Sequence, residues 1–443
     1  MFLPEYVQTC ITRLEQAGFA AYAVGGCVRD ACLGLIPHDY DLCTSALPEE
    51  TEAVFAGYRL VLAGKKHGTV AVVTDGGIVE ITTFRTEGAY LDNRHPAWVK
   101  FVPDIEADLA RRDFTVNAMA FSPTRGFADP FGGRGDLENH ILRAVGDPAT
   151  RFEEDSLRIL RGVRFAVRYG LRVEENTLDA MFHLAPLMDN LARERVFDEL
   201  CKLLLLVSAE DLIRFAPILA AVIPELKPMI GFNQRNPHHA FDLFTHTAQV
   251  CAAVPPLLPV RWAGLLHDTG KIATFTLDDG GRGHFYGHAR QSAAIADQVL
   301  HRLKAPRQLR EQAVFLIEKH MNLLEPDKKL LRRRIAQYGM ESVLQLLQLQ
   351  LADFGGKGTD ASENACWFDQ TLSIIQAIRE EDSCLSLKDL AVNGRDLMAI
   401  GFLPGKDIGI CLQKLLELVI DEKLPNEKET LLENAKHFLQ SAT

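Results

Sequence analysis

Apolar and polar residues follow two different spacings along the 443-residue chain, and the change of spacing divides it. From about residue 20 to residue 143, short β-branched runs such as 70–73 (VAVV) and 79–84 (VEITTF) are separated by glycine and proline. Runs of this length and composition are typical of β-strands. The preceding segment, 1–18, instead has the apolar spacing of an amphipathic helix. The pattern therefore predicts a mixed α/β head.

The strand pattern fades after residue 146. Leu157, Leu160 and Val163 recur at three-residue intervals, as apolar residues do along one side of a helix, and most of the later chain is helical in pattern. The predicted fold class is α+β and multidomain, since the length exceeds what one core holds. The predicted parts are a mixed α/β head over 1–145, an all-helical neck over 146–207, a helical body over 208–360 and a helical tail over 361–443.

The composition limits the partners and the compartment of the chain. A net charge of −11 argues against indiscriminate coating of nucleic acid, so a nucleic-acid site must be a local patch. The basic clusters at 302–310 and 328–334 are the best candidates, although each is equally well explained as a solvated helix face. Nine scattered cysteines, no secretory N-terminus and only short apolar runs predict reduced thiols, a cytoplasmic location and no membrane partner.

Residues 25–30 (GGCVRD) have the composition of a phosphate cradle. Gly25 and Gly26 lack Cβ, so the backbone there can approach a triphosphate closely. A helix beginning near Val28 would direct its amides at the same anion, and Arg29 would pair with phosphate oxygens. Gly26 and Arg29 are therefore predicted to bind a nucleotide. A glycine pair alone is usually just a turn.

Residues 38–41 (HDYD) follow this cradle and supply two carboxylates. If 40–42 is a strand, Asp39 and Asp41 project from the same strand face, because side chains alternate along a strand. Mg²⁺ binds proteins through one or two carboxylates together with substrate phosphates. Asp39 and Asp41 are therefore the predicted catalytic magnesium ligands. Glu80 is the candidate for a third carboxylate, and a structural role for it is equally probable.

Two more polar segments stand in apolar surroundings, at 111–118 (RRDFTVNA) and 154–165 (EDSLRILRGVRF). Asp155, Arg158, Arg161 and Arg164 are spaced three residues apart, which places them along one ridge of a helix. Several arginines could then line a base and a triphosphate together. The alternative is an exposed helix with an ordinary ion pair between Asp155 and Arg158.

With 129–133 (DPFGG), these motifs make residues 20–205 resemble the class II CCA-adding enzymes and bacterial poly(A) polymerases. The resemblance implies untemplated, Mg²⁺-dependent addition of C, C and A from CTP and ATP to the tRNA 3′ end, with release of pyrophosphate. It implies that Asp39 and Asp41 bind the metals and that Asp155 and Arg158 read the base. It further implies that Arg112 holds the nucleotide and that Asn117 orders the same loop.

Two segments bear on which member of this group the chain resembles. Residues 88–96 (GAYLDNRHP) resemble the flexible loop that is shortened or missing in enzymes adding only CC, which favours a capacity to add A. Residues 64–70 (GKKHGTV) depart from the Arg-Arg-Phe-Arg-Leu type of sequence in bacterial poly(A) polymerases, which favours CCA addition. A poly(A) polymerase and a partial CC- or A-adding enzyme remain alternatives.

The body contains His246, His267 and Asp268 within 265–271 (LLHDTGK), and Asp353, an order that resembles the HD phosphohydrolase domain. Imidazole and carboxylate groups from separate helices can bind a divalent metal, and the resemblance implies these four ligands. His288 and His320 leave a second metal open. The HD-type body could hydrolyse phosphate esters or serve as a scaffold. The chain could also be an HD phosphohydrolase with a nucleotide-sensing head, or a non-catalytic RNA-binding protein.

Overall fold

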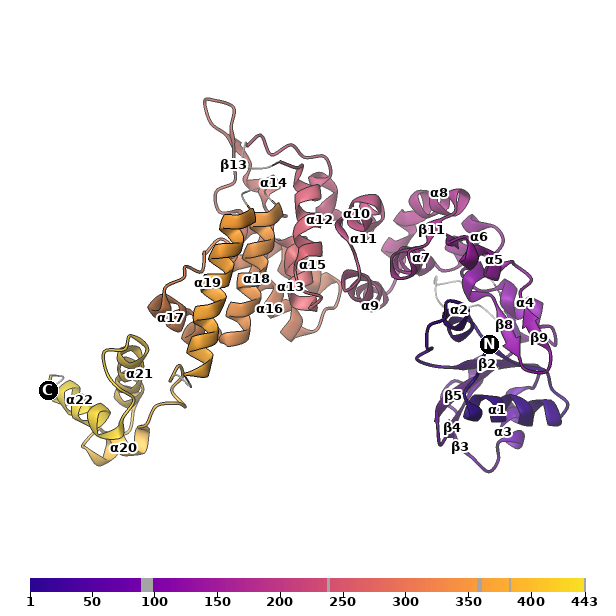
Figure 1. Cartoon of the computed structure of the whole chain (residues 1–443), viewed down its shortest axis with the longest axis horizontal. Helices are drawn as coiled ribbons and strands as arrows, with labels where there is room; N and C mark the ends of the chain where they lie inside the picture. The colour runs from indigo at the N-terminus through magenta and orange to yellow at the C-terminus, as the bar shows by residue number, and fades with distance from the viewer. Residues whose placement is uncertain (89–98, 237–239, 357–360, 382–383, 442–443) are drawn as a thin grey trace. The chain divides into compact units, whose positions relative to one another are not determined.

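The computed structural model of the chain describes residues 1–88, 99–236, 240–356, 361–381 and 384–441 (Figure 1). Nearly all of the loop predicted to support A addition, 88–96, lies outside the described residues. The chain forms two compact units, one of residues 1–207 and 215–227, the other of residues 208–214 and 228–443. The finer division into head, neck, body and tail stays a prediction.

A seven-stranded sheet forms the centre of the head, as the mixed α/β prediction requires. Its strands β2 and β5 are parallel, and its other neighbours are antiparallel. Helices α1 (Glu5–Gln16) and α3 (Pro48–Val54) pack on this sheet. In sheet order the strands are β3 (Arg59–Val61), β4 (Thr69–Thr74), β5 (Gly77–Thr83), β2 (Asp41–Thr44), β1 (Ala21–Val24), β8 (Ala120–Ser122) and β9 (Gly126–Ala128).

Alternation along β5 explains how this sheet positions polar groups. Val79 and Ile81 are buried, whereas Glu80 between them is exposed. Strand β2 begins at Asp41, and Asp39 lies in the segment before it. The expectation that Asp39 and Asp41 share one strand is therefore wrong. The turn that follows α2 (Gly26–Cys32) delays the strand until after Tyr40.

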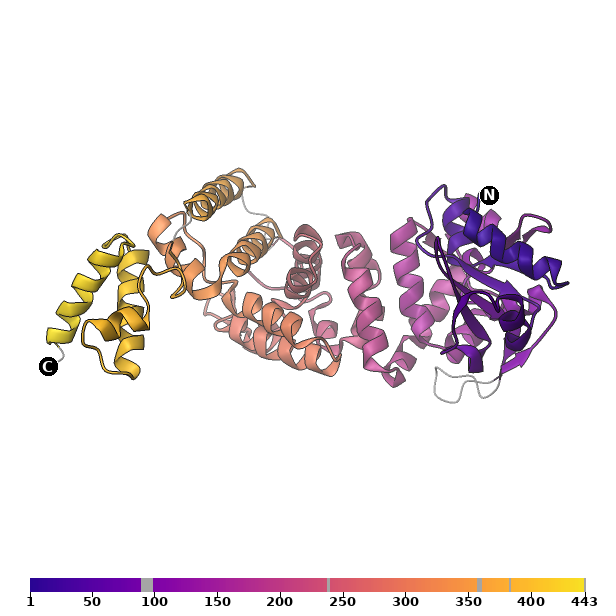
Figure 2. The same cartoon turned by 90° about the horizontal axis from the view of Figure 1, so that it is seen from below.

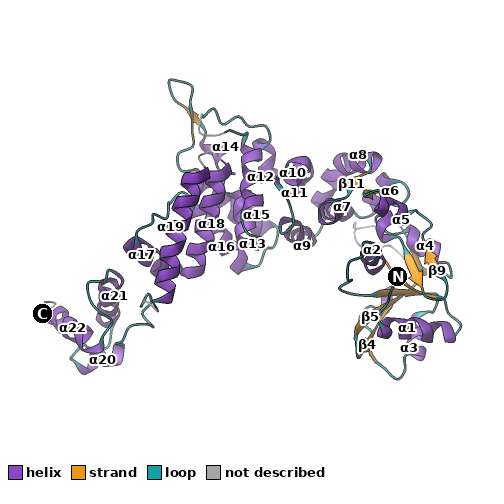
Figure 3. Cartoon of the chain, viewed as in Figure 1, coloured by secondary structure: helices purple, strands orange, loops and turns teal. Residues whose placement is uncertain are grey.

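The remainder of the first unit is mainly helical (Figure 3), but the expected all-helical neck contains a short strand. Strand β11 (Arg172–Val173) pairs in parallel with β10 (Ile141–Leu142), and β6 (Arg85–Glu87) pairs with β7 (Val99–Phe101). The other elements are α4 (Ile105–Ala110), η2 (Thr115–Asn117), α5 (Gly133–Glu138), α6 (Pro148–Glu154), α7 (Leu157–Tyr169), α8 (Glu175–Leu184), η3 (Ala185–Asn190), α9 (Arg193–Leu204) and α11 (Ala216–Val222).

A group of mutually packed helices forms the core of the second unit (Figures 1 and 2). These are α12 (Leu243–Ala253), α13 (Leu258–Leu266), α15 (His288–Arg302), α16 (Arg307–Lys319) and α18 (Met340–Gly356). Pro255 and Pro256 lie between α12 and α13, and Pro259 stands in the first turn of α13, where a proline is tolerated. Short helix α14 (Lys271–Thr274) and a hairpin of β12 (Thr276–Leu277) and β13 (Gly283–His284) lie between α13 and α15.

The last helices have an apolar cluster of their own that includes Leu415, Val419 and Leu431. They are α20 (Gly394–Ala399), α21 (Lys406–Ile420) and α22 (Lys428–Ser441), preceded by α19 (Ala361–Glu380). Arg332 of α17 (Lys328–Tyr338) is buried and donates to the carbonyl of Ile420 at 2.9 Å. The basic cluster at 328–334 is thus partly used within the protein. Among the described residues, no helix is long and apolar enough to cross a membrane.

Candidate functional site

The glycine turn before α2 keeps open a space that a side chain would fill. Gly25 has a φ of +76°, and a Cβ there would lie 2.7 Å from Arg112 Nη1. A Cβ on Gly26 would lie 3.6 Å from Arg29 Nη2. Backbone and two guanidinium groups therefore approach one another here, as a phosphate cradle requires.

Three carboxylates lie near this turn, Asp41 and Glu80 on the sheet and Asp39 in the segment before β2. Asp41 pairs in register with Glu80 across the parallel strands β2 and β5, and both side chains are exposed. Desolvation by the surrounding protein atoms and the charges of Asp39 and Glu80 raise the pKa of Asp41 to about 6, although Arg112 opposes the shift. Neighbouring carboxylates concentrate negative charge, which a divalent cation would offset. This donor set fits Mg²⁺.

Arg112 lies between the glycine turn and these carboxylates. Its Nη2 is 3.6 Å from Asp108 Oδ2, and its buried Nε has no hydrogen-bond acceptor among the described residues. Its charge lowers the pKa of Asp41. A buried donor in this position is suited to a phosphate oxygen, because buried polar groups are normally paired. The geometry agrees with the nucleotide-holding role that the resemblance implies.

Arg29 has protein partners at each of its guanidinium nitrogens. Nη1 donates to Asn117 Oδ1 at 2.6 Å, while Nε and Nη2 donate to Asp30 Oδ1 at 2.9 and 2.7 Å. The group also lies over the ring of Tyr169, 4.3 Å from its centroid. In this arrangement Arg29 fixes the 117 loop and α7 against α2, and a phosphate would have to share its donors.

Asp113 continues this network toward α7. Its Oδ1 accepts from Asn117 Nδ2 at 3.0 Å, and its Oδ2 accepts from Arg161 Nε and Nη2 at 2.9 and 2.7 Å. Burial alone would raise the pKa of Asp113, but the charge of Arg161 and the hydrogen bonds from Asn117 and Arg161 lower it to about 2. An ionised, buried carboxylate thus ties the loop to the helix.

The predicted base-reading pair, Asp155 at the end of α6 and Arg158 in α7, is arranged differently from a simple ion pair. Asp155 Oδ2 accepts from Arg195 Nη2 of α9 at 2.8 Å, whereas Arg158 Nη1 donates to Glu154 Oε2 at 2.7 Å. Arg158 is buried and also donates to the carbonyl of Arg111 at 3.1 Å. The alternative of an exposed helix with an Asp155–Arg158 pair is therefore wrong, because other partners hold both groups.

Arg164 completes the ridge but faces the helical part of the unit. Its Nε donates to Glu199 Oε2 of α9 at 2.6 Å, and both side chains are buried. Burial would raise the pKa of Glu199, but the hydrogen bond and charge of Arg164 lower it. Asp155 and Arg164 thus pair with α9, Arg158 with Glu154 of α6, and Arg161 with Asp113 of the loop after α4.

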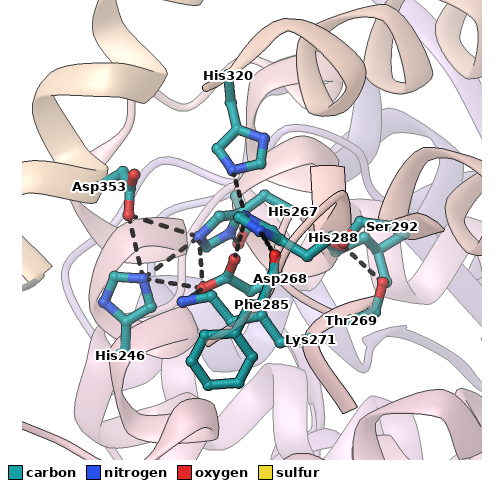
Figure 4. Close-up of polar contacts among 12 residues, drawn as sticks. His246, His267, Asp268, Thr269, Lys271, Phe285, His288, Ser292, His320 and Asp353 are labelled. Carbon is teal, nitrogen blue, oxygen red and sulfur yellow. Dashed lines mark hydrogen bonds and ion pairs between the residues drawn. The ribbon is translucent and has the colours of Figure 1, made fainter. Parts of the chain in front are cut away.

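The second unit brings together all four predicted HD ligands (Figure 4). His246 Nε2 lies 3.3 Å from Asp268 Oδ2 and 3.2 Å from Asp353 Oδ1, and His267 Nε2 lies 3.3 Å from Asp268 Oδ2. His288 and His320 border the same centre, with their Nε2 atoms 3.3 Å apart. These side chains come from α12, the α13 end, α15, the α16 end and α18, so packing of the helices creates the centre.

The centre opens into a pocket of about 370 Å³ lined by residues that include Asp268, Lys271, His288, His320 and Asp353. Burial would lower the pKa of His246, but hydrogen bonds to Asp268 and Asp353 raise it to about 9. Burial also lowers the pKa of His320 to about 4, helped by the charge of His267. A buried group of imidazoles and carboxylates is a donor set that suits a transition-metal or zinc ion.

Comparison with known proteins assigns the chain to a family. The Poly A polymerase head domain family matches residues 21–143, and a tRNA nucleotidyltransferase domain 2 family matches residues 285–435. The CCA-adding enzyme of Streptococcus gordonii is 34% identical over 436 residues, which cover 97% of each chain. That of Ligilactobacillus salivarius is 34% identical over 440 residues, covering 97% of this chain and 95% of the relative. The chain belongs to the CCA-adding enzyme family.

This CCA-adding enzyme family member is therefore a nucleotidyltransferase. The crystal structure of the Bacillus stearothermophilus CCA-adding enzyme in complex with CTP has a TM-score of 0.75 and 27% identity, covering 100% of this chain and 99% of that one. The Thermotoga maritima CCA-adding enzyme complexed with tRNA has a TM-score of 0.62 and 22% identity, covering 99% and 96%. The α+β fold class predicted from the sequence is confirmed.

Several polar residues of this family member were not found by sequence reasoning. Arg195 pairs with Asp155, Glu199 with Arg164, and Asp113 with Arg161. Asp113 stood within the RRDFTVNA motif and could have been found there. Arg195 and Glu199 lie 40 and 35 residues from their partners in an ordinary amphipathic helix, which carries no local signal.

Proposed function

We propose that this enzyme adds C, C and A to the 3′ end of tRNA, using CTP and ATP and releasing pyrophosphate. The full-length similarity to CCA-adding enzymes carries the proposal. The group formed by Asp39, Asp41 and Glu80 beside Gly25 and Arg112 supports it with a suitable chemistry. The tRNA 3′-oxygen bonds to the α-phosphorus, the bond to the bridging oxygen breaks, pyrophosphate leaves, and the hydroxyl proton passes to water.

The residues of the head have separate roles in this proposal. Asp39 and Asp41 would hold Mg²⁺, which would supply Lewis-acid chemistry that lowers the pKa of the attacking hydroxyl and offsets phosphate charge. Gly25, Gly26 and Arg112 hold the triphosphate. Arg29 contributes indirectly, because its hydrogen bonds hold Asn117 and Asp30 in place.

Base selection falls to Asp155 and Arg158 in this proposal. A carboxylate accepts hydrogen bonds and a guanidinium donates them, which suits the Watson–Crick edges of C and A. Uracil presents a different pattern, so a fixed pair would leave groups unpaired against UTP. Arg161 and Arg164 hold this side of α7 in place through their ion pairs with Asp113 and Glu199.

Extension of three tRNA transcripts, ending before CCA, after C and after CC, tests this function. With Mg²⁺, CTP and ATP, the shortest transcript should gain three nucleotides and then stop. Asp41→Asn should lower the rate at least about 100-fold, because it removes a metal ligand. Asp75→Asn, in the β4–β5 turn of the same domain, is the matched control and should retain activity. Arrest after CC would favour a partial enzyme, and unlimited A addition a poly(A) polymerase.

The nine cysteines are all free thiols, which supports a reducing, cytoplasmic location for the enzyme. Thiol-specific labelling of the protein in intact and lysed cells would test this. Labelling without prior reduction at the exposed Cys32 and Cys366 is the expected result.

A second candidate function is hydrolysis of a phosphate ester by the body. The convergence of His246, His267, Asp268 and Asp353 favours it. A divalent metal held by these groups would activate water and polarise the phosphoryl oxygen. Water adds to phosphorus, the P–O ester bond breaks, and the leaving alcohol takes a proton.

Hydrolysis of p-nitrophenyl phosphate and its bis ester in Mn²⁺, Co²⁺ or Ni²⁺ tests this second function. His267→Asn should abolish turnover, because the imidazole is buried in the centre. His301→Asn on the exposed side of α15 is the control. If wild-type protein binds metal but hydrolyses neither ester, the centre is structural and the body acts as a scaffold.

A further inference from the structure

One side of α7 carries a row of three side chains that contact the head. Arg161, Phe165 and Tyr169 are spaced four residues apart, so they lie above one another on the same face of the helix. Arg161 Cζ lies 5.2 Å from the centroid of the Phe165 ring. The rings of Phe165 and Tyr169 are stacked, with their centroids 6.2 Å apart. Tyr169 is the member of this row that lies beyond the 154–165 motif of the sequence.

Arg29 of α2 lies over the two rings of this row. Its Cζ is 4.3 Å from the centroid of Tyr169 and 5.2 Å from that of Phe165. Arg29 is buried, and its N–H groups donate to Asn117 and Asp30. Those bonds occupy the edge of the guanidinium, and a cation over an aromatic face is attracted to it. Tyr169, the nearer ring, therefore restricts where the guanidinium can lie.

The hydroxyl of Tyr169 makes a second contact with α2. Its Oη donates to Asp30 Oδ1 at 3.1 Å, the same oxygen that accepts from Arg29. Burial raises the pKa of Tyr169, and the charge of Asp30 adds to this against the opposing charge of Arg29. The phenol therefore keeps its proton at neutral pH and remains a donor. Asp30 thus holds Arg29 and Tyr169 together.

Two attachments on this face fix α7 against the head. The first is the ion pair of Arg161 with Asp113, and the second is the contact of Tyr169 with Arg29 and Asp30. The two attachments are eight residues apart in the sequence, or about 12 Å along a helix axis. A helix held at one point can pivot, whereas two points set its direction.

The direction of α7 matters because different elements would bind the two ends of a nucleotide. In the function proposed above, the triphosphate is held at the start of α2, and Asp155 and Arg158 beside the start of α7 read the base. Arg29 stands close to the triphosphate end, since its Nη2 lies 3.6 Å from where a Cβ on Gly26 would be. A residue that ties Arg29 to α7 therefore sets the spacing of the two binding parts, and a shift in that spacing weakens both.

We propose that Tyr169 is a positioning residue for nucleotide binding, which holds α7 to the phosphate cradle through Arg29 and Asp30. This inference rests on the nucleotide addition proposed above. The ring supplies most of the restraint because it lies against the guanidinium, and the hydroxyl adds to it through Asp30. In this role Tyr169 acts on the binding and selection of the triphosphate and leaves the chemical step unchanged.

Two substitutions of Tyr169 separate the ring from the hydroxyl. Tyr169→Leu removes both, and it should raise the Kd and KM of CTP and of ATP about tenfold while kcat stays within about twofold of wild type. The preference for CTP over UTP, as kcat/KM, should fall about fivefold. Tyr169→Phe keeps the ring and should stay within about threefold of wild type in each quantity. Equilibrium dialysis with labelled triphosphates gives Kd, and tRNA extension gives the kinetic constants.

Tyr58→Leu is the matched control in the same unit. Arg13 lies over the Tyr58 ring at 5.1 Å, and the ring of Phe55 packs edge-on against it at 5.6 Å. Tyr58 precedes β3, which β4 and β5 separate from β2 in the sheet. The control therefore loses an arginine–tyrosine contact of the same kind away from Asp41. Its Kd, KM and preference for CTP should equal those of wild type.

The outcomes separate this inference from the function on which it rests. A Tyr169→Leu protein with lower kcat for every triphosphate, but with the Kd, KM and preference of wild type, has only a smaller folded fraction and overturns the inference. A loss in Tyr169→Phe as large as in Tyr169→Leu also overturns it, because the ring would then have no effect.

Wild-type protein that binds CTP and ATP but does not extend tRNA overturns the proposed function alone, because Kd still tests Tyr169. Wild-type protein that binds neither triphosphate overturns both. If circular dichroism shows that Tyr169→Leu is unfolded, Tyr169→Met, whose side chain fills more of the space of the ring, is measured in its place against the same expectations.

Discussion

Gly25 adopts a backbone conformation that L-residues avoid, and it also borders the guanidinium of Arg112. Gly25→Ala should raise the KM for both CTP and ATP at least about tenfold, because strain and contact with Arg112 together cost 1–3 kcal/mol. Steady-state extension of a tRNA transcript measures this effect.

Gly18→Ala is the matched control for that substitution. Gly18 also has a positive φ, +91°, but a Cβ there meets no atom within 4 Å. Backbone strain is therefore similar in the two variants and the contact is absent in one. An equal loss of activity in both would show that the effect comes from reduced folding, and the cradle role of Gly25 would have to be abandoned.

Asp113 is expected to stabilise the head in a pH-dependent way. Its pKa falls from 3.8 to about 2 on folding, so its ionised form contributes stability above pH 4 that is lost as the pH falls toward 2. The difference in unfolding free energy between wild type and Asp113→Asn should therefore shrink by about 2 kcal/mol between pH 6 and pH 2. Urea unfolding at each pH, monitored through hydrogen exchange of the amides in residues 108–120, measures this difference in unfolding free energy. A difference that is constant with pH would contradict this assignment.

At the scale of elements, local periodicity predicted most of the strands and helices that form. Strands β4 and β5 and helix α7 were expected because buried residues alternate or recur within each segment itself. The place of Asp39 was predicted wrongly, because the end of a turn depends on how α2 docks. Long-range pairs such as Asp155 with Arg195 were also missed, since the two residues meet only when α7 packs on α9.

The contact between α7 and α9 is expected to influence base selection. Arg195→Met leaves Asp155 without its guanidinium partner, so the carboxylate can reorient. We expect the preference for CTP and ATP over UTP and GTP to fall about tenfold, as kcat/KM, for a loss of 1–2 kcal/mol. Single-nucleotide incorporation with each triphosphate gives this ratio.

Arg193→Met offers a matched control on the same helix. Arg193 pairs with the exposed Asp189 at 2.6 Å, and an exposed ion pair of this kind contributes little. Its substitution should leave the preference unchanged. Identical selectivity in Arg195→Met and wild type would instead mean that Asp155 is positioned by the backbone of α7 alone.

At the scale of the whole molecule, the chain contains two sites with different donor chemistry in separate compact units. The head offers carboxylate oxygens alone, which suit Mg²⁺, while the body adds imidazoles, which suit softer divalent ions. The motif order in the sequence predicted both sites. It left His288 and His320 open as ligands of a second metal, and only the fold shows that they border the same centre, because α15 and α16 bring them together in the folded unit.

Because each site is built within its own unit, their activities should be separable. His267→Asn should remove metal from the body while changing kcat/KM for CTP by no more than about twofold, as expected for positions that share no partners. Asp41→Asn should have the opposite effect, abolishing nucleotide addition and leaving metal in the body. Metal content and tRNA extension, measured on the same preparations, give both quantities. If His267→Asn also slows CCA addition while circular dichroism shows that the variant is folded, the body takes part in the reaction of the head, and the two sites are functionally coupled.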